Sequence, residues 1–333
     1  MRWLLGFAGA GAGLWVYQGA WRAGWVYEDP HMLLAAPAAG LPRLLTILTG
    51  RATPEPVVAH GVNLALHGLV AAGVACLAWR LTRSRLATVV AGLGLLVQPV
   101  AVETGTYVAG GRGELLAALG IVGACVAVTW ASPWRWLLAG AGLAGAALAK
   151  ESAIVGLALV PLTWAVATGL TRQAWRRASM GAAACLLVGL VTVAPTDAQI
   201  RTLVNADLYA HEITAAEWAA TQSTAVVRLM GVALTGRGMT LDYDYDALSW
   251  ETRTAGAVGL GLCAALTLAL WRWAPVVAFG LSWMLLAVAL RLVIQTPRSY
   301  LNEHQFYVSL IGLVLAIAAG FGHAPRVEDT PKE

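Results

Sequence analysis

Two neighbouring carboxylates near the start of the chain have the clearest potential for chemistry. Glu28 and Asp29 lie in the segment Trp25–His31, directly after a long apolar run. A carboxylate that is partly shielded from water has a raised pKa and can accept the proton of an attacking hydroxyl. The pair predicts a general base close to a membrane surface. The alternative is an ordinary solvated loop.

A second group of polar residues lies inside an apolar segment. His60, Asn63 and His67 are spaced i, i+3 and i+7, which places them on one face of a helix. Polar side chains that face lipid are costly, so this face must look into the protein or into a wet cavity. The spacing fits substrate contact and hydrogen bonding between helices equally well.

Acids and cations also alternate where later apolar segments begin and end. Arg112 and Glu114 follow the Gly110-Gly111 pair, and Lys150 precedes Glu151. Each cation can form a structural salt bridge. Each can also hold a phosphate, the lysine as a point charge and the arginine as a fork of donors.

The segment 241–246 carries three alternating aspartates, Asp242, Asp244 and Asp246. It resembles the start of a calcium loop, but Ala247 stands where that loop needs Gly and Arg253 where it needs a bidentate Glu. We therefore expect no metal site here. The four cysteines lie singly inside apolar blocks, which predicts packing residues and not ligands.

The composition shows what must position these residues. Of the 333 residues, 59% are hydrophobic and only 12% are charged, about half the charged share of a soluble protein, which excludes an ordinary water-soluble enzyme. Apolar blocks of about 17 to 23 residues alternate with charged loops, as expected for helices that cross a core about 30 Å thick. We predict an all-α polytopic membrane protein with ten spans. The expected spans are 3–21, 57–79, 86–103, 114–132, 134–149, 152–170, 178–195, 255–271, 275–295 and 305–322.

The distribution of charge predicts the orientation of these spans. Short loops rich in arginine fall on one face with Arg2, whereas all but three of the 18 acidic residues fall on the opposite face. The positive-inside rule then places both termini in the cytoplasm. The working face is the periplasmic or extracellular one, with long loops over about 22–56 and 196–254 that contain interfacial helices. We expect one membrane domain, 1–322, and a polar cytoplasmic tail, 323–333; the net charge of +4 reflects these loops and not nucleic acid.

Several short fragments occur in a recognisable order. They are Val26-Tyr27-Glu28-Asp29, His60-x-x-Asn63-x-x-x-His67, Pro99-x-x-x-Glu103, Gly111-Arg112-x-Glu114, Lys150-Glu151, Leu241-Asp242-Tyr243 and Glu303-x-x-x-Tyr307. In this order, over about residues 25–310, the chain resembles bacterial relatives of the transmembrane and TPR repeat-containing O-mannosyltransferases, which belong to the GT-C class of membrane glycosyltransferases. The TPR repeats are absent from this chain.

The resemblance implies an inverting glycosyltransferase that moves a mannose-like sugar from a polyprenyl phosphate to a hydroxyl of a protein or glycan, without a cofactor. Asp29 or Glu28 would be the base. The implied residues that bind the donor phosphate are Arg112, Lys150, Arg298 and His304. The implied residues that line the substrate cavity are His60, Asn63, His67, Glu103, Asp242, Asp244, Glu303 and Tyr307.

The chain also departs from the family pattern, and the departures keep two other functions open. Gln98-Pro99-Val100-Ala101 replaces a His-Pro-x-His motif, and Glu303-His304-Gln305 replaces Glu-Arg-Tyr. These losses fit a non-catalytic subunit that packs against other membrane subunits. A transporter or flippase of lipid-linked sugars would also have many spans, but such proteins usually consist of two related halves, and this sequence shows no such repeat.

Overall fold

The structure is a computed structural model that describes residues 11, 15, 17, 48, 49, 52, 55–171, 214–239, 248–293 and 303–322. Within these residues the chain is helical and contains no strand, which confirms the predicted helical class. The helices are α4 (Pro56–Thr82), α5 (Arg85–Leu96), α6 (Ala101–Thr106), α7 (Val108–Val128), α8 (Arg135–Ala149), the short 3₁₀ helix η2 (Glu151–Val155), α9 (Gly156–Ala167), α12 (Ala215–Thr235), α13 (Trp250–Leu270), α14 (Pro275–Val293) and α15 (Glu303–Gly320).

The predicted count of ten spans is not confirmed. Four helices of the described residues are long and apolar enough to cross a membrane, namely Pro56–Thr82, Gly110–Val128, Trp250–Leu270 and Glu303–Gly320. The apolar helices α5, α8 and α9 have only 12, 15 and 12 residues, and at 1.5 Å per residue they are shorter than a hydrocarbon core about 30 Å thick. The predicted span 178–195 and the tail 323–333 lie outside the described residues, which include only residues 11, 15 and 17 of the predicted span 3–21.

The segment predicted as one span over 86–103 is instead two helices. Helix α5 ends at Leu96, and α6 begins at Ala101. Pro99 explains the interruption, because proline has no N–H to donate and disfavours helical geometry in the residue before it. The break leaves the carbonyl of Leu96 at a helix end inside the protein, where it needs a donor.

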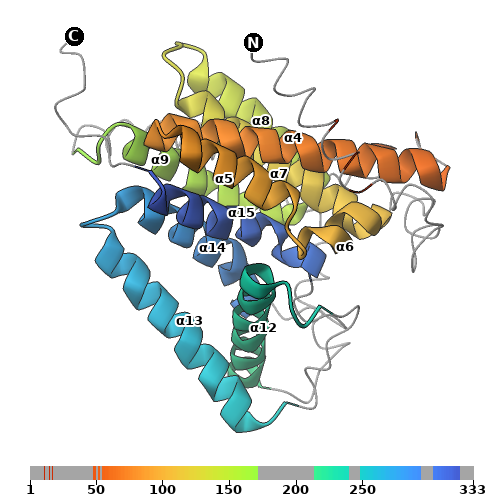
Figure 1. The fold of residues 1–333 in the computed structure, drawn as a ribbon, viewed down its shortest axis with the longest axis vertical. Coiled ribbons are helices and arrows are strands. Elements are labelled where there is room, and N and C mark those ends of the chain that lie inside the picture. The colour runs from red at the N-terminus through yellow and green to blue at the C-terminus, as the bar shows by residue number, and fades with distance from the viewer. Residues whose placement is uncertain are drawn as a thin grey trace, which may run out of the picture.

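Helix α15 lies at the centre of the arrangement. All but three of its 18 residues are buried, and Figure 1 shows it with α14 between α4, α5, α7 and α8 on one side and α12 and α13 on the other. Small residues allow this close packing. A Cβ atom on Gly312 would lie 2.5 Å from both the carbonyl oxygen of Gly280 and the amide nitrogen of Met284 on α14. Helices inside membranes commonly pack through such small residues.

The second long loop predicted from the sequence, 196–254, contains a helix, α12, as the pattern from Glu217 to Leu234 indicated. Its start is fixed by a capping box, in which the hydroxyl of Thr214 accepts from the amide of Glu217 and the Glu217 carboxylate accepts from the amide of Thr214. Helix α13, which packs on α12 and α14, leaves Val258, Leu262 and Leu266 more than half exposed. An exposed apolar face of this kind fits contact with lipid.

Candidate functional site

Arg112 is a fully buried cation on the first turns of α7. We expected the helix to begin near residue 114, with Arg112 in a loop. The structure corrects this, because α7 begins at Val108, directly after the extended backbone of Tyr107. Gly111 makes the early start possible, since a Cβ there would collide with the carbonyl oxygen of Thr104 on α6. Arg112 is therefore held inside the bundle with an exposed fraction of 0%.

Oxygens on α4 and on the segment before it fix the guanidinium of Arg112. Its Nε donates to Oδ1 of Asn63 at 2.8 Å, its Nη2 to the carbonyl of Ala59 at 2.7 Å, and its Nη1 to the carbonyl of Thr49 at 3.0 Å. The amide nitrogen of Asn63 donates in turn to the carbonyl of Val108 at 3.4 Å. Asn63 therefore orients the arginine and the start of α7 together. His60, one turn before Asn63, is fully buried on the same face of α4.

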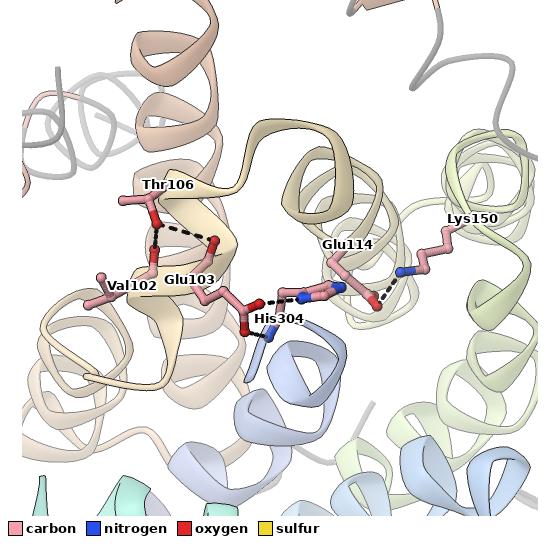
Figure 2. Close-up of polar contacts among 6 residues, drawn as sticks. All are labelled: Val102, Glu103, Thr106, Glu114, Lys150 and His304. Atoms are coloured by element: carbon pink, nitrogen blue, oxygen red, sulfur yellow. Dashed lines mark hydrogen bonds and ion pairs between the residues drawn. The ribbon is translucent and has the colours of Figure 1, made fainter. Parts of the chain in front are cut away.

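Both carboxylate oxygens of Glu103 on α6 bind His304 at the start of α15, as Figure 2 shows. Its Oε2 accepts from the backbone amide of His304 at 2.9 Å, and its Oε1 lies 2.9 Å from Nδ1 of the same residue. A carboxylate can only accept, so Nδ1 carries a proton. These two contacts with Glu103 therefore fix the orientation and tautomer of His304. Nε2 is the ring nitrogen that faces away from Glu103.

Nε2 of His304 faces the first turn of α7. A Cβ atom on Gly110 would lie 3.2 Å from this nitrogen. The ring of Tyr107 stands edge-on to the imidazole, with 5.3 Å between the ring centroids. A Cβ on Gly110 would also collide with the ring of Tyr107, so the glycine lets Tyr107 and His304 pack closely against α7.

Lys150 and Glu114 form an ion pair at the same end of α7. Nζ of Lys150 lies 2.6 Å from Oε1 of Glu114, and the two side chains are 11% and 2% exposed. Glu114 is four residues beyond Gly110 on α7, so the pair lies about one turn, or about 6 Å along the helix axis, from the place that faces His304. Figure 2 shows the two pairs in the same close-up. We did not select Glu114 as a site residue, although a carboxylate inside an apolar span is itself a functional signal.

His67 and Tyr307 have a structural task in this arrangement. Nδ1 of His67 lies 2.8 Å from the hydroxyl of Tyr307, and Nε2 lies 3.2 Å from the carbonyl of Leu96. A carbonyl only accepts, so Nε2 carries the proton and Tyr307 donates to Nδ1. Tyr17 donates to the same carbonyl at 2.9 Å. Nε2 of His67 thus serves the helix end that Pro99 creates, and Nδ1 connects α4 to Tyr307 on α15.

Glu303 is the first residue of α15 and is buried, with 4% of its surface exposed. A carboxylate in the first turn of a helix is favoured by the positive end of the helix dipole. The other predicted site residues, Glu28, Asp29, Arg298, Asp242 and Asp244, lie outside the described residues. The position of the proposed base relative to the cations therefore stays a prediction.

The described site residues provide hydrogen-bond donors and the positive charges of Arg112 and Lys150, and a partner orients each of these side chains. Asn63 holds Arg112, Glu103 holds His304, and Glu114 holds Lys150. Among the described residues, no group of three or more His, Cys, Asp or Glu side chains is placed to hold a metal ion. Such an arrangement is suited to binding an anion or a polar ligand. No family model, curated protein or solved structure matches the chain.

Proposed function

We propose that the protein is a membrane glycosyltransferase that moves a sugar from a polyprenyl phosphate to an acceptor hydroxyl at the outer face of the membrane. One observation supports this most strongly. Near the start of α7, Arg112 faces α4, whereas Gly110 and Glu114, one turn apart on another face of the helix, face His304 and Lys150. Buried cations at membrane depth mark sites for charged ligands.

The proposed reaction joins the acceptor oxygen to the anomeric carbon and breaks the bond between that carbon and the phosphate oxygen. Asp29 or Glu28 takes the proton of the hydroxyl, and the polyprenyl phosphate leaves with the electron pair on the opposite face of the sugar, which inverts the anomeric centre. Arg112, held by Asn63, stabilises the negative charge on the leaving phosphate, with His304, held by Glu103, as a helper. Their fixed orientation lowers the cost of reorganising the site during the reaction.

A second candidate function is a non-catalytic subunit of a larger membrane assembly. Its support is that the Glu103–His304 and Glu114–Lys150 pairs connect different helices, as structural bridges do. Both functions predict a folded helical membrane protein, so only activity separates them.

Transfer of a labelled sugar tests the proposal. The full chain in proteoliposomes is supplied with a polyprenyl-phosphate hexose and hydroxyl-bearing peptides or glycans, and Glu28→Gln, Asp29→Asn and the double variant are compared with wild type. Glu55→Gln is the matched control, because Glu55 precedes α4 and makes no side-chain cap. We expect one single variant to lose at least about a hundredfold in rate, within the range for general bases, and the control to keep its rate. Activity in the double variant would show that neither carboxylate is the base. A wild-type chain that is inactive and co-purifies with other subunits would favour the non-catalytic function.

A further inference from the structure

The Glu114–Lys150 pair has an incomplete set of hydrogen bonds. Oε1 of Glu114 accepts from Lys150, but Oε2 is buried and receives a hydrogen bond from no described residue. The residue is 1% exposed. Leaving a buried carboxylate oxygen without a donor is costly, and native proteins seldom do so without a reason.

The chemistry of the pair limits what can complete it. A carboxylate oxygen needs a donor, which excludes a fully ionised phosphate, because its oxygens only accept and would be repelled by Glu114. A cation would be repelled by Lys150. A hydroxyl fits both partners, since it donates to Oε2 and accepts from the ammonium, which has three donors. Ser152, two residues after Lys150, adds a buried hydroxyl that also has no partner among the described residues.

The place of the pair on α7 suggests which hydroxyl this is. Gly110 faces Nε2 of His304, and Glu114 lies one turn further along the helix, about 6 Å away. If His304 contacts the phosphate of the donor, the next group along the ligand is the sugar ring. A sugar ring attached to that phosphate can span the distance to Glu114.

We propose that the Glu114–Lys150 pair binds a ring hydroxyl of the sugar on the lipid donor, and that Lys150 therefore recognises the sugar and not the phosphate. This inference rests on the proposed function and names the part of the ligand that the pair selects. The pair acts in specificity, whereas Arg112 and His304 act on the phosphate.

The test compares two ligands that differ only in the sugar. Dissociation constants are measured for a polyprenyl phosphate and for the corresponding polyprenyl-phosphate hexose, with the full chain in lipid nanodiscs. In Glu114→Gln the side-chain amide places an N–H donor at the position of Oε2. A sugar hydroxyl at this position then faces two donors, the amide and the Lys150 ammonium, and has no acceptor for its own proton. We expect the preference for the sugar-bearing lipid to fall by at least about tenfold, as for loss of a charged hydrogen bond, with binding of the bare polyprenyl phosphate unchanged.

Two further variants keep the test decisive. E114Q/K150M removes the ion pair as a whole and avoids an unpaired buried charge, so it covers the case in which Glu114→Gln does not fold. Glu217→Gln is the control, because Glu217 is on the exposed start of α12. A preserved sugar preference in the folded site variants would overturn the inference and leave the proposed function standing. A wild-type chain that binds neither lipid would overturn the proposed function itself.

Discussion

At the scale of single residues, the buried polar groups are organised in pairs that join different helices. Arg112 on α7 is held by Asn63 on α4, and His304 on α15 is held by Glu103 on α6. An unpaired charge in a low-dielectric interior is expensive, so each pair fixes the helices that supply it. These residues therefore position the site and stabilise the fold at the same time.

The hydrogen bonds of His67 give a prediction at this scale. Tyr307→Phe removes one bond, whereas His67→Phe removes two and leaves the hydroxyl of Tyr307 without its acceptor. A lost buried hydrogen bond costs about 1 kcal/mol, and an unsatisfied buried group about 1–3 kcal/mol. We expect thermal unfolding in detergent to show a larger loss for His67→Phe than for Tyr307→Phe. The double variant should lose less than the sum of the two, because both act on one bond; additive losses would contradict the shared bond.

The sequence predicted the polar face of α4 but not the partners of its residues. A period of 3.6 residues is enough to place His60, Asn63 and His67 together and to require their burial, and all three are buried. Their partners are distant in the chain, because Asn63 meets Arg112 and His67 meets Tyr307, 240 residues away. Periodicity contains no information on such contacts, since helix packing decides them.

At the scale of helices, lengths and crossings depend on a few glycines and prolines. Pro99 divides a long apolar segment into α5 and α6, and the division carries Glu103 onto a separate short helix beside the start of α15. Hydropathy alone treats this segment as one span. The sequence therefore located the apolar segments well but predicted their boundaries less well.

The close contact between α14 and α15 predicts that one added methyl group lowers the stability of the protein. Gly312→Ala would place a Cβ 2.5 Å from backbone atoms of Gly280 and Met284, so the helices must separate. Overpacking of this kind typically costs about 1–3 kcal/mol. We expect a clearly lower melting temperature in detergent for Gly312→Ala. Gly261→Ala is the matched control, because a Cβ there meets nothing within 4 Å, and equal melting temperatures for the two variants would contradict the close contact.

The capping box of α12 predicts a dependence on pH. Hydrogen bonds from the amide and hydroxyl of Thr214 lower the pKa of Glu217. A carboxylate with a lowered pKa stabilises the folded helix start above its unfolded pKa, and the effect is lost as the pH falls through the folded value. Amide exchange at residues 215–218 should be faster in Glu217→Gln than in wild type at neutral pH, and the difference should shrink in acid. A difference that is independent of pH would contradict the role of the carboxylate.

At the scale of the whole molecule, the helices surround α15, and the described site residues gather near its first turn. These residues come from helices α4, α6, α7 and α15 and from the residue after α8. Helices α12 and α13, on the other side of α15, expose apolar side chains such as Leu262. The proposed ligand site and this exposed apolar surface are therefore different parts of the protein.

The central claim is that this end of the bundle receives the phosphate of a polyprenyl lipid. The most direct test uses a polyprenyl phosphate with a photoreactive group beside the phosphate, followed by mass spectrometry of the cross-linked peptides from proteoliposomes. We predict adducts in residues 56–67, 101–114 and 303–307, which are suppressed by unlabelled polyprenyl phosphate and not by the uncharged polyprenol. Adducts confined to α13, or equal suppression by both competitors, would contradict the claim.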